Sequence, residues 1–326
     1  MTYDYVIFCP YFGKLPVNFD LWLKSCSYNN KFKFIVFTDD KRIFKTPKNV
    51  EIKNMSYKEL IDKIQSKFDF KISLNNPYKL CDYKVAYGYI FEEYLSDCKY
   101  WGYCDLDLIF GDLEKFLPKK EYDKISHLGP FSLYKNTDKI NKAFMLNGES
   151  KFNYKGIFSS NVHFGFDEIG KYGINNIFLN NGFSIYDYQK NCADLNCTLE
   201  GMNVTSGHSG NYVTDEADRV FKFDNGKIIG YTLKNNKIVK KEYAYIHFQK
   251  RRMEINVSNY TENYMILHHS FENYQKNINN EYIKNNQPSF RRDYKKFIKL
   301  KMRAIKARIK RYSVIIFRGN KCEENN

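Results

Sequence analysis

The stretch WGYCDLDLIFGDL, residues 101–113, places two carboxylates one residue apart inside an otherwise apolar and aromatic segment. Charge buried in such surroundings is costly unless a cation or hydrogen-bond donors meet it. Because side chains at i and i+2 share one face of a strand, Asp105 and Asp107 can point into one site while Leu106 and Leu108 face the core. We therefore expect a divalent cation at a strand end, held by oxygen ligands and able to bind a diphosphate.

A simpler interpretation is that the two aspartates end a strand and cap the next helix. A cap needs only one aspartate, however, and the aromatic residues before Asp105 imply burial. The metal interpretation is therefore preferred.

Length and composition limit the class of protein without naming a function. The 326 residues are 43% hydrophobic and 17% aromatic, enough for one large α/β domain with an appendage or for two modest domains. The eight cysteines form no CxxC pair and mostly lie in apolar segments, as expected of reduced core residues in a cytosolic protein. No signal peptide and no run of about eighteen apolar residues is seen, so we expect a cytoplasmic protein that is not integral to the membrane.

The net charge of +15 is concentrated near the C-terminus. Residues 290–319 contain twelve Lys or Arg and a single acid, Asp293. An apolar stripe at helical spacing runs through the same segment: Phe290, Tyr294, Ile298, Met302, Ile305, Ile309, Tyr312 and Ile316. A basic amphipathic helix of this kind predicts that residues 290–318 bind an anionic membrane surface.

One other interpretation of this helix stays open. It could pack on the domain and leave a solvated basic face. Nucleic-acid binding is not expected, because no recognised zinc-finger or RNP pattern accompanies the charge.

Strand and helix patterns alternate along the first hundred residues. Strands are predicted at 4–9, 32–38, 50–53 and 100–105, and helices at 18–28, 56–68 and 79–95. Ser56 and Glu59 have the spacing of a capping box. This order predicts an α/β fold with a mainly parallel central sheet and ligands at its carboxyl-end loops. No GxGxxG or Walker-type loop is present, so dinucleotide and P-loop chemistry are not expected.

The motifs together resemble a known family. PYFGK (10–14), FTDD (37–40), PYKLCDYKVAYGYIF (77–91), WGYCDLDLIFGDL (101–113) and YIHFQKR (245–251) are similar to the GT-A-type, DxD-containing glycosyltransferases of bacterial capsular and cell-wall polysaccharide clusters. The resemblance covers about residues 3–255. It implies a GT-A-like domain over residues 1–265 and leaves a helical, basic C-terminal extension over residues 266–326.

The resemblance also implies a function. It predicts a hexosyltransferase that uses Mn2+ or Mg2+ to move a sugar from a nucleoside-diphosphate donor, with UDP-sugars favoured, to a lipid-linked or oligosaccharide acceptor in surface polysaccharide synthesis. The basic helix would hold the enzyme peripherally on the inner face of the plasma membrane.

Roles for individual residues follow from the resemblance. The metal ligands would be Asp105, Asp107 and the late His247, although a core histidine satisfied by the backbone is an alternative for the last. Lys250 or Arg251 would stabilise the leaving nucleoside diphosphate. The other donor-binding residues would be Pro10, Tyr11, Phe12, Gly13, Asp39, Asp40, Lys79, Asp82, Tyr83 and Asp105. For Lys79 and Asp82 a solvated helix face is the alternative.

The catalytic base is the least determined role. Asp167 and Glu168, which follow an apolar Phe-Gly-Phe, are the preferred carboxylates for catalysis or acceptor binding, ahead of Asp187, Asp194, Asp215 and Glu216.

Two other classes of protein share single features of this sequence. A haloacid-dehalogenase-like phosphatase also has DxD after a strand, but it expects Thr or Val where this chain has Ile109. A non-catalytic basic protein that binds membranes or polyanions would leave Asp105 and Asp107 without a purpose.

Overall fold

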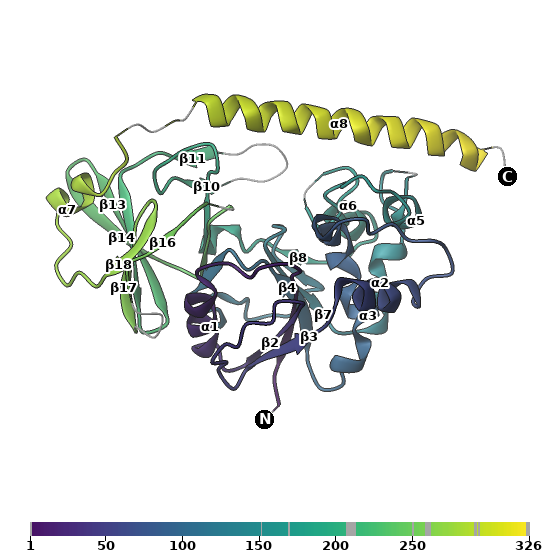
Figure 1. Ribbon diagram of the computed structural model, residues 1–326, viewed down its shortest axis with the longest axis horizontal. Coiled ribbons are helices and arrows are strands. Elements are labelled where there is room, and N and C mark those ends of the chain that lie inside the picture. Colours follow the sequence, from purple (N-terminus) through teal and green to yellow (C-terminus); the bar gives the residue numbers. More distant parts are fainter. Residues whose placement is uncertain are drawn as a thin grey trace.

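The computed structural model describes residues 2–150, 152–168, 170–206, 213–249, 251–257, 262–289, 292 and 294–323, the last seven by backbone alone. Figure 1 shows a strand-rich body with one long helix, α8, lying across it on the side opposite the N-terminus. The described strands form three sheets.

The first sheet contains the strands predicted near the N-terminus. Its order is β3-β2-β1-β4-β7-β6-β8. The bounds are β1 (Tyr5–Pro10), β2 (Phe32–Thr38), β3 (Val50–Asn54), β4 (Tyr100–Cys104), β6 (Lys124–Ile125), β7 (Phe131–Lys135) and β8 (Ile185–Tyr186). Neighbours among β3, β2, β1 and β4 are parallel, whereas β7 is antiparallel to both β4 and β6. The described sheets are mixed in direction, so a mainly parallel central sheet is not confirmed.

The second sheet joins early and late parts of the chain in the order β11-β10-β9-β15-β5. Its strands are β5 (Leu108–Phe110), β9 (Cys192–Leu195), β10 (Val204–Ser206), β11 (Val213–Asp215) and β15 (Tyr245–His247). β15 is antiparallel to β5 and parallel to β9. The chain passes from the first sheet into the second between β4 and β5, which is where the two aspartates lie.

The third sheet has the order β14-β13-β12-β17-β18-β16. Its strands are β12 (Arg219–Asp224), β13 (Lys227–Lys234), β14 (Lys237–Tyr243), β16 (Glu254–Ile255), β17 (Asn263–Ile266) and β18 (Ser270–Asn273). Asn225 and Gly226 both have positive φ in the turn between β12 and β13, as a two-residue type I′ hairpin requires. Residues 270–273 are a strand, so the helical character predicted for residues 266–326 is wrong at this point, and the predicted boundary at 265 falls inside β17.

Helices are mostly short. The α-helices are α1 (Phe19–Ser27), α2 (Tyr57–Gln65), α3 (Tyr87–Ile90), α4 (Asp138–Asn141), α5 (Tyr154–Phe158), α6 (Ile174–Asn180), α7 (Asn280–Asn285) and α8 (Tyr294–Glu323). The 3-10 helices are η1 (Pro77–Ala86), η2 (Glu92–Tyr94), η3 (Glu114–Phe116), η4 (Ala143–Met145) and η5 (Gln189–Asn191). The capping box is confirmed: Ser56 accepts from the backbone N–H of Glu59, and the Glu59 carboxylate accepts from that of Ser56.

The prediction of one long helix at 79–95 is wrong. Its place is taken by η1, the single turn α3 and η2. Most of η1 is buried, including Lys79, Asp82, Tyr83 and Lys84. Polar side chains of this segment bond to neighbouring backbone, and such tertiary contacts outweigh the helix propensity on which the prediction rested.

Candidate metal centre

Strand pairing brings the late histidine to the early aspartates. Asp105 follows β4 directly and Asp107 precedes β5, so the pair lies in the bend between two sheets and not along one strand as predicted. β15 pairs with β5 in a register that sets His247 opposite Leu108, and the Phe248 N–H donates to the Asp107 carbonyl at 3.0 Å. Leu106 and Leu108 are buried, as the pattern predicted.

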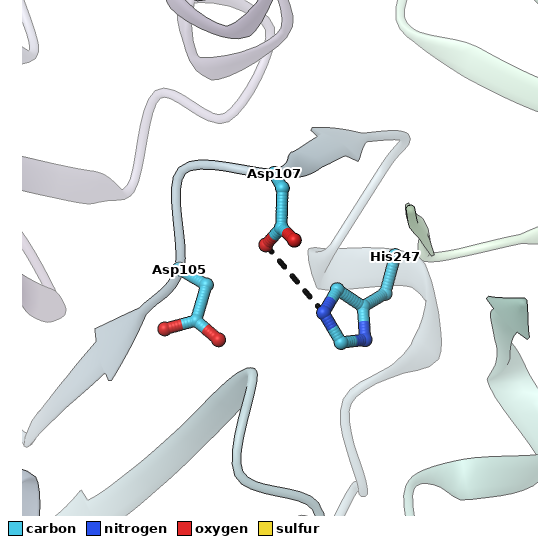
Figure 2. A group of neighbouring side chains, drawn as sticks. All are labelled: Asp105, Asp107 and His247. Carbon is cyan, nitrogen blue, oxygen red and sulfur yellow. Dashed lines mark ion pairs between the residues drawn. The ribbon is translucent and has the colours of Figure 1, made fainter. Parts of the chain in front are cut away.

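The three side chains have the geometry of a cation site. Figure 2 shows them turned toward one another, Asp105 and Asp107 from the β4–β5 bend and His247 from β15. One ligand atom from each lies within 4.8 Å of the other two, and His247 Nε2 is 3.5 Å from Asp107 Oδ1. Two carboxylate oxygens and an imidazole nitrogen are a donor set that suits Mn2+, and Mg2+ less closely.

A further carboxylate fixes the orientation of the histidine ring. Asp194 on β9 lies beside His247 in the parallel β9–β15 pair, and its Oδ1 is 2.8 Å from His247 Nδ1. Gln249 Nε2 donates to the same oxygen at 2.8 Å. This arrangement leaves Nε2 facing Asp107, as in the carboxylate–histidine–metal groups of metalloproteins.

The surroundings of His247 favour positive charge. Burial lowers the pKa of the imidazole, but the carboxylates of Asp107 and Asp194 outweigh it and raise that pKa to about 10. The pocket thus stabilises a cation, whether a proton on the ring or a metal ion beside it. A core histidine satisfied by backbone groups does not describe His247, because its nitrogens face two carboxylates.

A buried lysine links the metal centre to the predicted catalytic carboxylates. Lys84 Nζ is 2.7 Å from Asp105 Oδ1 and 3.1 Å from Asp167 Oδ2, and it donates to the Gly129 carbonyl at 3.0 Å. Lys84 is 7% exposed and Asp167 only 2%. The structure therefore brings Asp167 to within one side chain of Asp105, although 62 residues separate them in the sequence.

Asp167 and Glu168 have different environments. Burial raises the pKa of Asp167 to about 8, against the opposing charge of Lys84. Its Oδ1 has no hydrogen-bond partner in the part of the chain that the structure describes. Glu168, in contrast, is exposed to solvent. Of the two, Glu168 is the one that solvent and a ligand can reach directly.

The loop after β1 approaches the metal centre through Tyr11. Burial raises the pKa of the Tyr11 phenol, and the negative charge of Asp107 adds to that rise. Pro10 ends β1, and Phe12 is buried with its ring 5.1 Å from that of Tyr57. Gly13 has a φ of +97°, a backbone conformation that favours glycine.

Asp39 and Asp40 support this loop. Asp39 accepts from the Gly13 N–H at 2.7 Å, and Asp40 accepts from the Leu15 N–H at 2.8 Å. Asp40 also pairs with Arg42, whose guanidinium holds the pKa of that carboxyl well below its usual range. The pair predicted to bind the nucleotide thus shapes the loop at the end of β1, and Asp40 is already paired with a cation.

Lys79, Asp82 and Tyr83 form a buried support and not a solvated face. Lys79 Nζ is 2.7 Å from Asp82 Oδ2 and donates to the carbonyls of Ile157 and Val162. Asp82 accepts from the N–H groups of Phe164 and Phe166, and Tyr83 donates to the Phe158 carbonyl at 2.8 Å. These bonds hold the segment that carries Asp167. Direct contact with a donor, as predicted for the three, is not available to side chains at most 1% exposed.

Arg251 has a similar supporting position. Its guanidinium donates to the carbonyls of Glu200, Leu199, Gly201 and His268, and burial lowers its pKa. Because its guanidinium is hydrogen-bonded to backbone carbonyls, Arg251 is not placed to bind a diphosphate, and the role predicted for it is wrong. Lys250, the alternative, lies outside the described residues.

Sequence reasoning missed Lys84 and gave Asp194 only a secondary place. Both are charged residues within buried, largely apolar elements, η1 and β9. A charged residue in an apolar segment is the same signal that identified Asp105 and Asp107, and it would also have identified Lys84 and Asp194.

Comparisons with known proteins add a family and little else. No curated protein matches the chain. Among solved structures, the apo-form glycosyltransferase GlyE of Streptococcus pneumoniae matches with a TM-score of 0.32 and 15% identity, over 58% of this chain and 46% of that chain. A family model matches residues 7–275, and the chain therefore belongs to the Family of unknown function (DUF6625).

Proposed function

We propose that this protein is a metal-dependent glycosyltransferase that moves a sugar from a nucleoside-diphosphate donor to an acceptor hydroxyl. The observation that carries the proposal is the convergence of Asp105, Asp107 and His247, with His247 oriented by Asp194. Two carboxylates in an apolar segment are costly to maintain, and a site for a divalent cation gives them a purpose.

Asp105, Asp107 and His247 would hold Mn2+ or Mg2+. Such an ion supplies charge stabilisation to the diphosphate as the glycosidic bond breaks. The charge of Asp107 contributes to the raised pKa of Tyr11, which lies on a loop whose backbone Asp39 and Asp40 hold in place. We assign this loop, Pro10 to Gly13, to the nucleotide side of the donor pocket, with Lys250 as the cation for the leaving diphosphate.

The acceptor side of the site is assigned to the segment that carries Asp167 and Glu168. Lys84 holds Asp167 next to Asp105, which fixes this segment against the metal centre. Glu168 is exposed and can accept a proton from an acceptor hydroxyl, whereas Asp167 is buried and ion-paired and positions the segment. A lipid-linked or oligosaccharide acceptor of surface polysaccharide synthesis fits this role, and UDP-sugars are the first donors to examine.

The proposal is tested by a Mn2+-dependent screen of UDP- and GDP-sugars for binding and slow hydrolysis. Wild type is compared with Asp107→Asn and with a control, Asp112→Asn, which removes a carboxylate from the same segment. Donor-specific signal that needs Mn2+, is lost in Asp107→Asn and is kept in the control supports the proposal. Donor binding that is indifferent to Mn2+ and to Asp107 refutes it.

A further inference from the structure

The helix α8 exposes apolar side chains where a globular protein would not. The described members of the apolar stripe, from Tyr294 to Ile316, are each between 51% and 70% exposed. Phe290, its first predicted member, lies outside the described residues. The pattern that the sequence predicted as an amphipathic helix is therefore present, but the body of the protein does not cover its apolar face.

The opposite face of α8 is the one that contacts the body. Lys296 Nζ is 3.0 Å from Glu200 Oε1, and Arg311 Nη1 donates to the Phe164 carbonyl at 3.2 Å. Val314 and Ile315 pack against the large core cluster that includes Phe164. These contacts are centred roughly 160° around the helix axis from the apolar stripe, which therefore points away from the body. Figure 1 shows α8 lying along the surface of the molecule.

Basic residues flank the apolar stripe on both sides. Lys295, Lys299, Arg303, Lys306 and Lys310 lie along one edge at helical spacing. Lys301 and Arg308 lie along the other, and all of these residues are exposed. No acidic residue occurs between Tyr294 and Cys322. An outward apolar face with cationic edges matches a bilayer surface, whose interior accepts the stripe while anionic headgroups meet the edges.

We propose that α8 is a membrane-docking helix that lies flat on an anionic phospholipid bilayer with its apolar stripe in the interface. No helix in the described residues is long and apolar enough to cross a bilayer. This contact places the protein peripherally on the inner face of the plasma membrane. The proposal does not depend on the glycosyltransferase assignment.

The charge distribution argues against other occupants of this face. A second copy of the chain would bring the same cationic edges together across the stripe, and like charges repel. A nucleic acid would pair with the edges but leave the stripe in water. Anionic lipid is the partner that satisfies both features at once.

The same contacts tie α8 to the candidate site. Arg311 bonds to Phe164, whose N–H is held by Asp82 and which lies three residues before Asp167. Membrane docking through the outward face leaves this inward contact in place. The segment that carries Asp167 and Glu168 is thereby held on the side of the body that faces the lipid.

Vesicle flotation of the full-length chain tests the proposal. Vesicles of phosphatidylcholine alone are compared with vesicles that also contain phosphatidylglycerol, each at low and high salt. Wild type should bind the anionic vesicles at least about tenfold more tightly than the neutral ones, and added salt should weaken binding. The double variant Ile305→Glu/Ile309→Glu should lose at least about tenfold in affinity for anionic vesicles.

Matched controls separate insertion from general surface effects. Ile43→Glu changes an isoleucine that is 99% exposed outside the helix, and it should bind as wild type does. Lys306→Glu/Lys310→Glu should weaken binding more than Lys119→Glu/Lys120→Glu, which makes the same charge change elsewhere on the exposed surface.

Three outcomes would overturn the proposal. The first is wild-type protein that does not float with anionic vesicles. The second is equal binding by wild type and Ile305→Glu/Ile309→Glu. The third is that wild type is a dimer by light scattering in the absence of vesicles and that Ile305→Glu/Ile309→Glu is a monomer. The apolar stripe would then be an interface between two protein chains.

Discussion

Replacing Asp194 with Asn removes the charge behind His247 while keeping the size of the side chain. Asp194 Oδ1 contacts His247 Nδ1 at 2.8 Å and accepts from Gln249 Nε2 at 2.8 Å. An asparagine oxygen can accept both bonds, so the ring can keep its place. What is lost is the charge that strengthens the His247 bond and makes Nε2 a better ligand.

The expected consequence is weaker metal binding without unfolding. Loss of a carboxylate behind a metal-bound histidine costs about 10- to 100-fold in affinity, or about 1.4–2.7 kcal/mol. Isothermal titration with Mn2+ measures the dissociation constant, and thermal unfolding of the metal-free protein checks that the fold is intact. Glu121→Gln, which removes a surface carboxylate paired with Lys135, serves as the control.

An unchanged Mn2+ dissociation constant in Asp194→Asn would contradict this prediction, since His247 would then not be a ligand or Asp194 would not act on it. A loss of Mn2+ affinity of the same size in Glu121→Gln would show a general effect of charge, and it would also contradict the prediction.

Three further predictions concern buried groups. Lys84→Met leaves the Asp167 carboxylate without its cation and should lower the free energy of unfolding by about 3 kcal/mol in urea titrations at about pH 9, above the raised pKa of Asp167, while an unchanged value would mean that the ion pair contributes nothing. Burial lowers the pKa of Lys124 to about 7, so the unfolded state binds more protons between about pH 7 and about pH 10 and wild-type stability rises with pH over that range. The free energy of unfolding of Lys124→Met, relative to that of wild type, should therefore be about 3 kcal/mol higher at about pH 6 than at about pH 9.5, and a difference that does not change with pH would contradict this. Gly88→Ala puts a methyl group 2.2 Å from the Trp101 ring and should cost about 1–3 kcal/mol or more in the same urea assay, and a neutral result would show that Trp101 moves freely.

Local patterns in the sequence determined several elements correctly. The apolar strand at 32–38 coincides with β2, and the Ser56–Glu59 capping box starts α2. The apolar stripe predicted a long amphipathic helix, and α8 has that form. Each of these features depends on neighbours a few residues apart in the chain, which is why single-sequence patterns reveal them.

Segments whose conformation depends on distant partners were predicted less well. The stretch at 79–95 has a composition that suits a helix, but buried bonds from Lys79 and Asp82 to residues 157–166 hold its first part as a 3-10 helix. The roles predicted for Arg251 and Tyr83 were wrong for the same reason. Both side chains donate hydrogen bonds to backbone carbonyls that are distant in sequence.

Local composition was enough to single out Asp105 and Asp107 as charges in an apolar segment that need a partner. The burial implied by that composition is only partial in the structure, where both side chains are intermediate in exposure. The identity of those partners depends on tertiary contacts. Pairing of β15 with β5 and β9 brings His247 and Asp194 to Asp107, and packing of η1 brings Lys84 between Asp105 and Asp167. These contacts join residues separated by as many as 140 positions, and their register is set by strand pairing and core packing that no local pattern specifies.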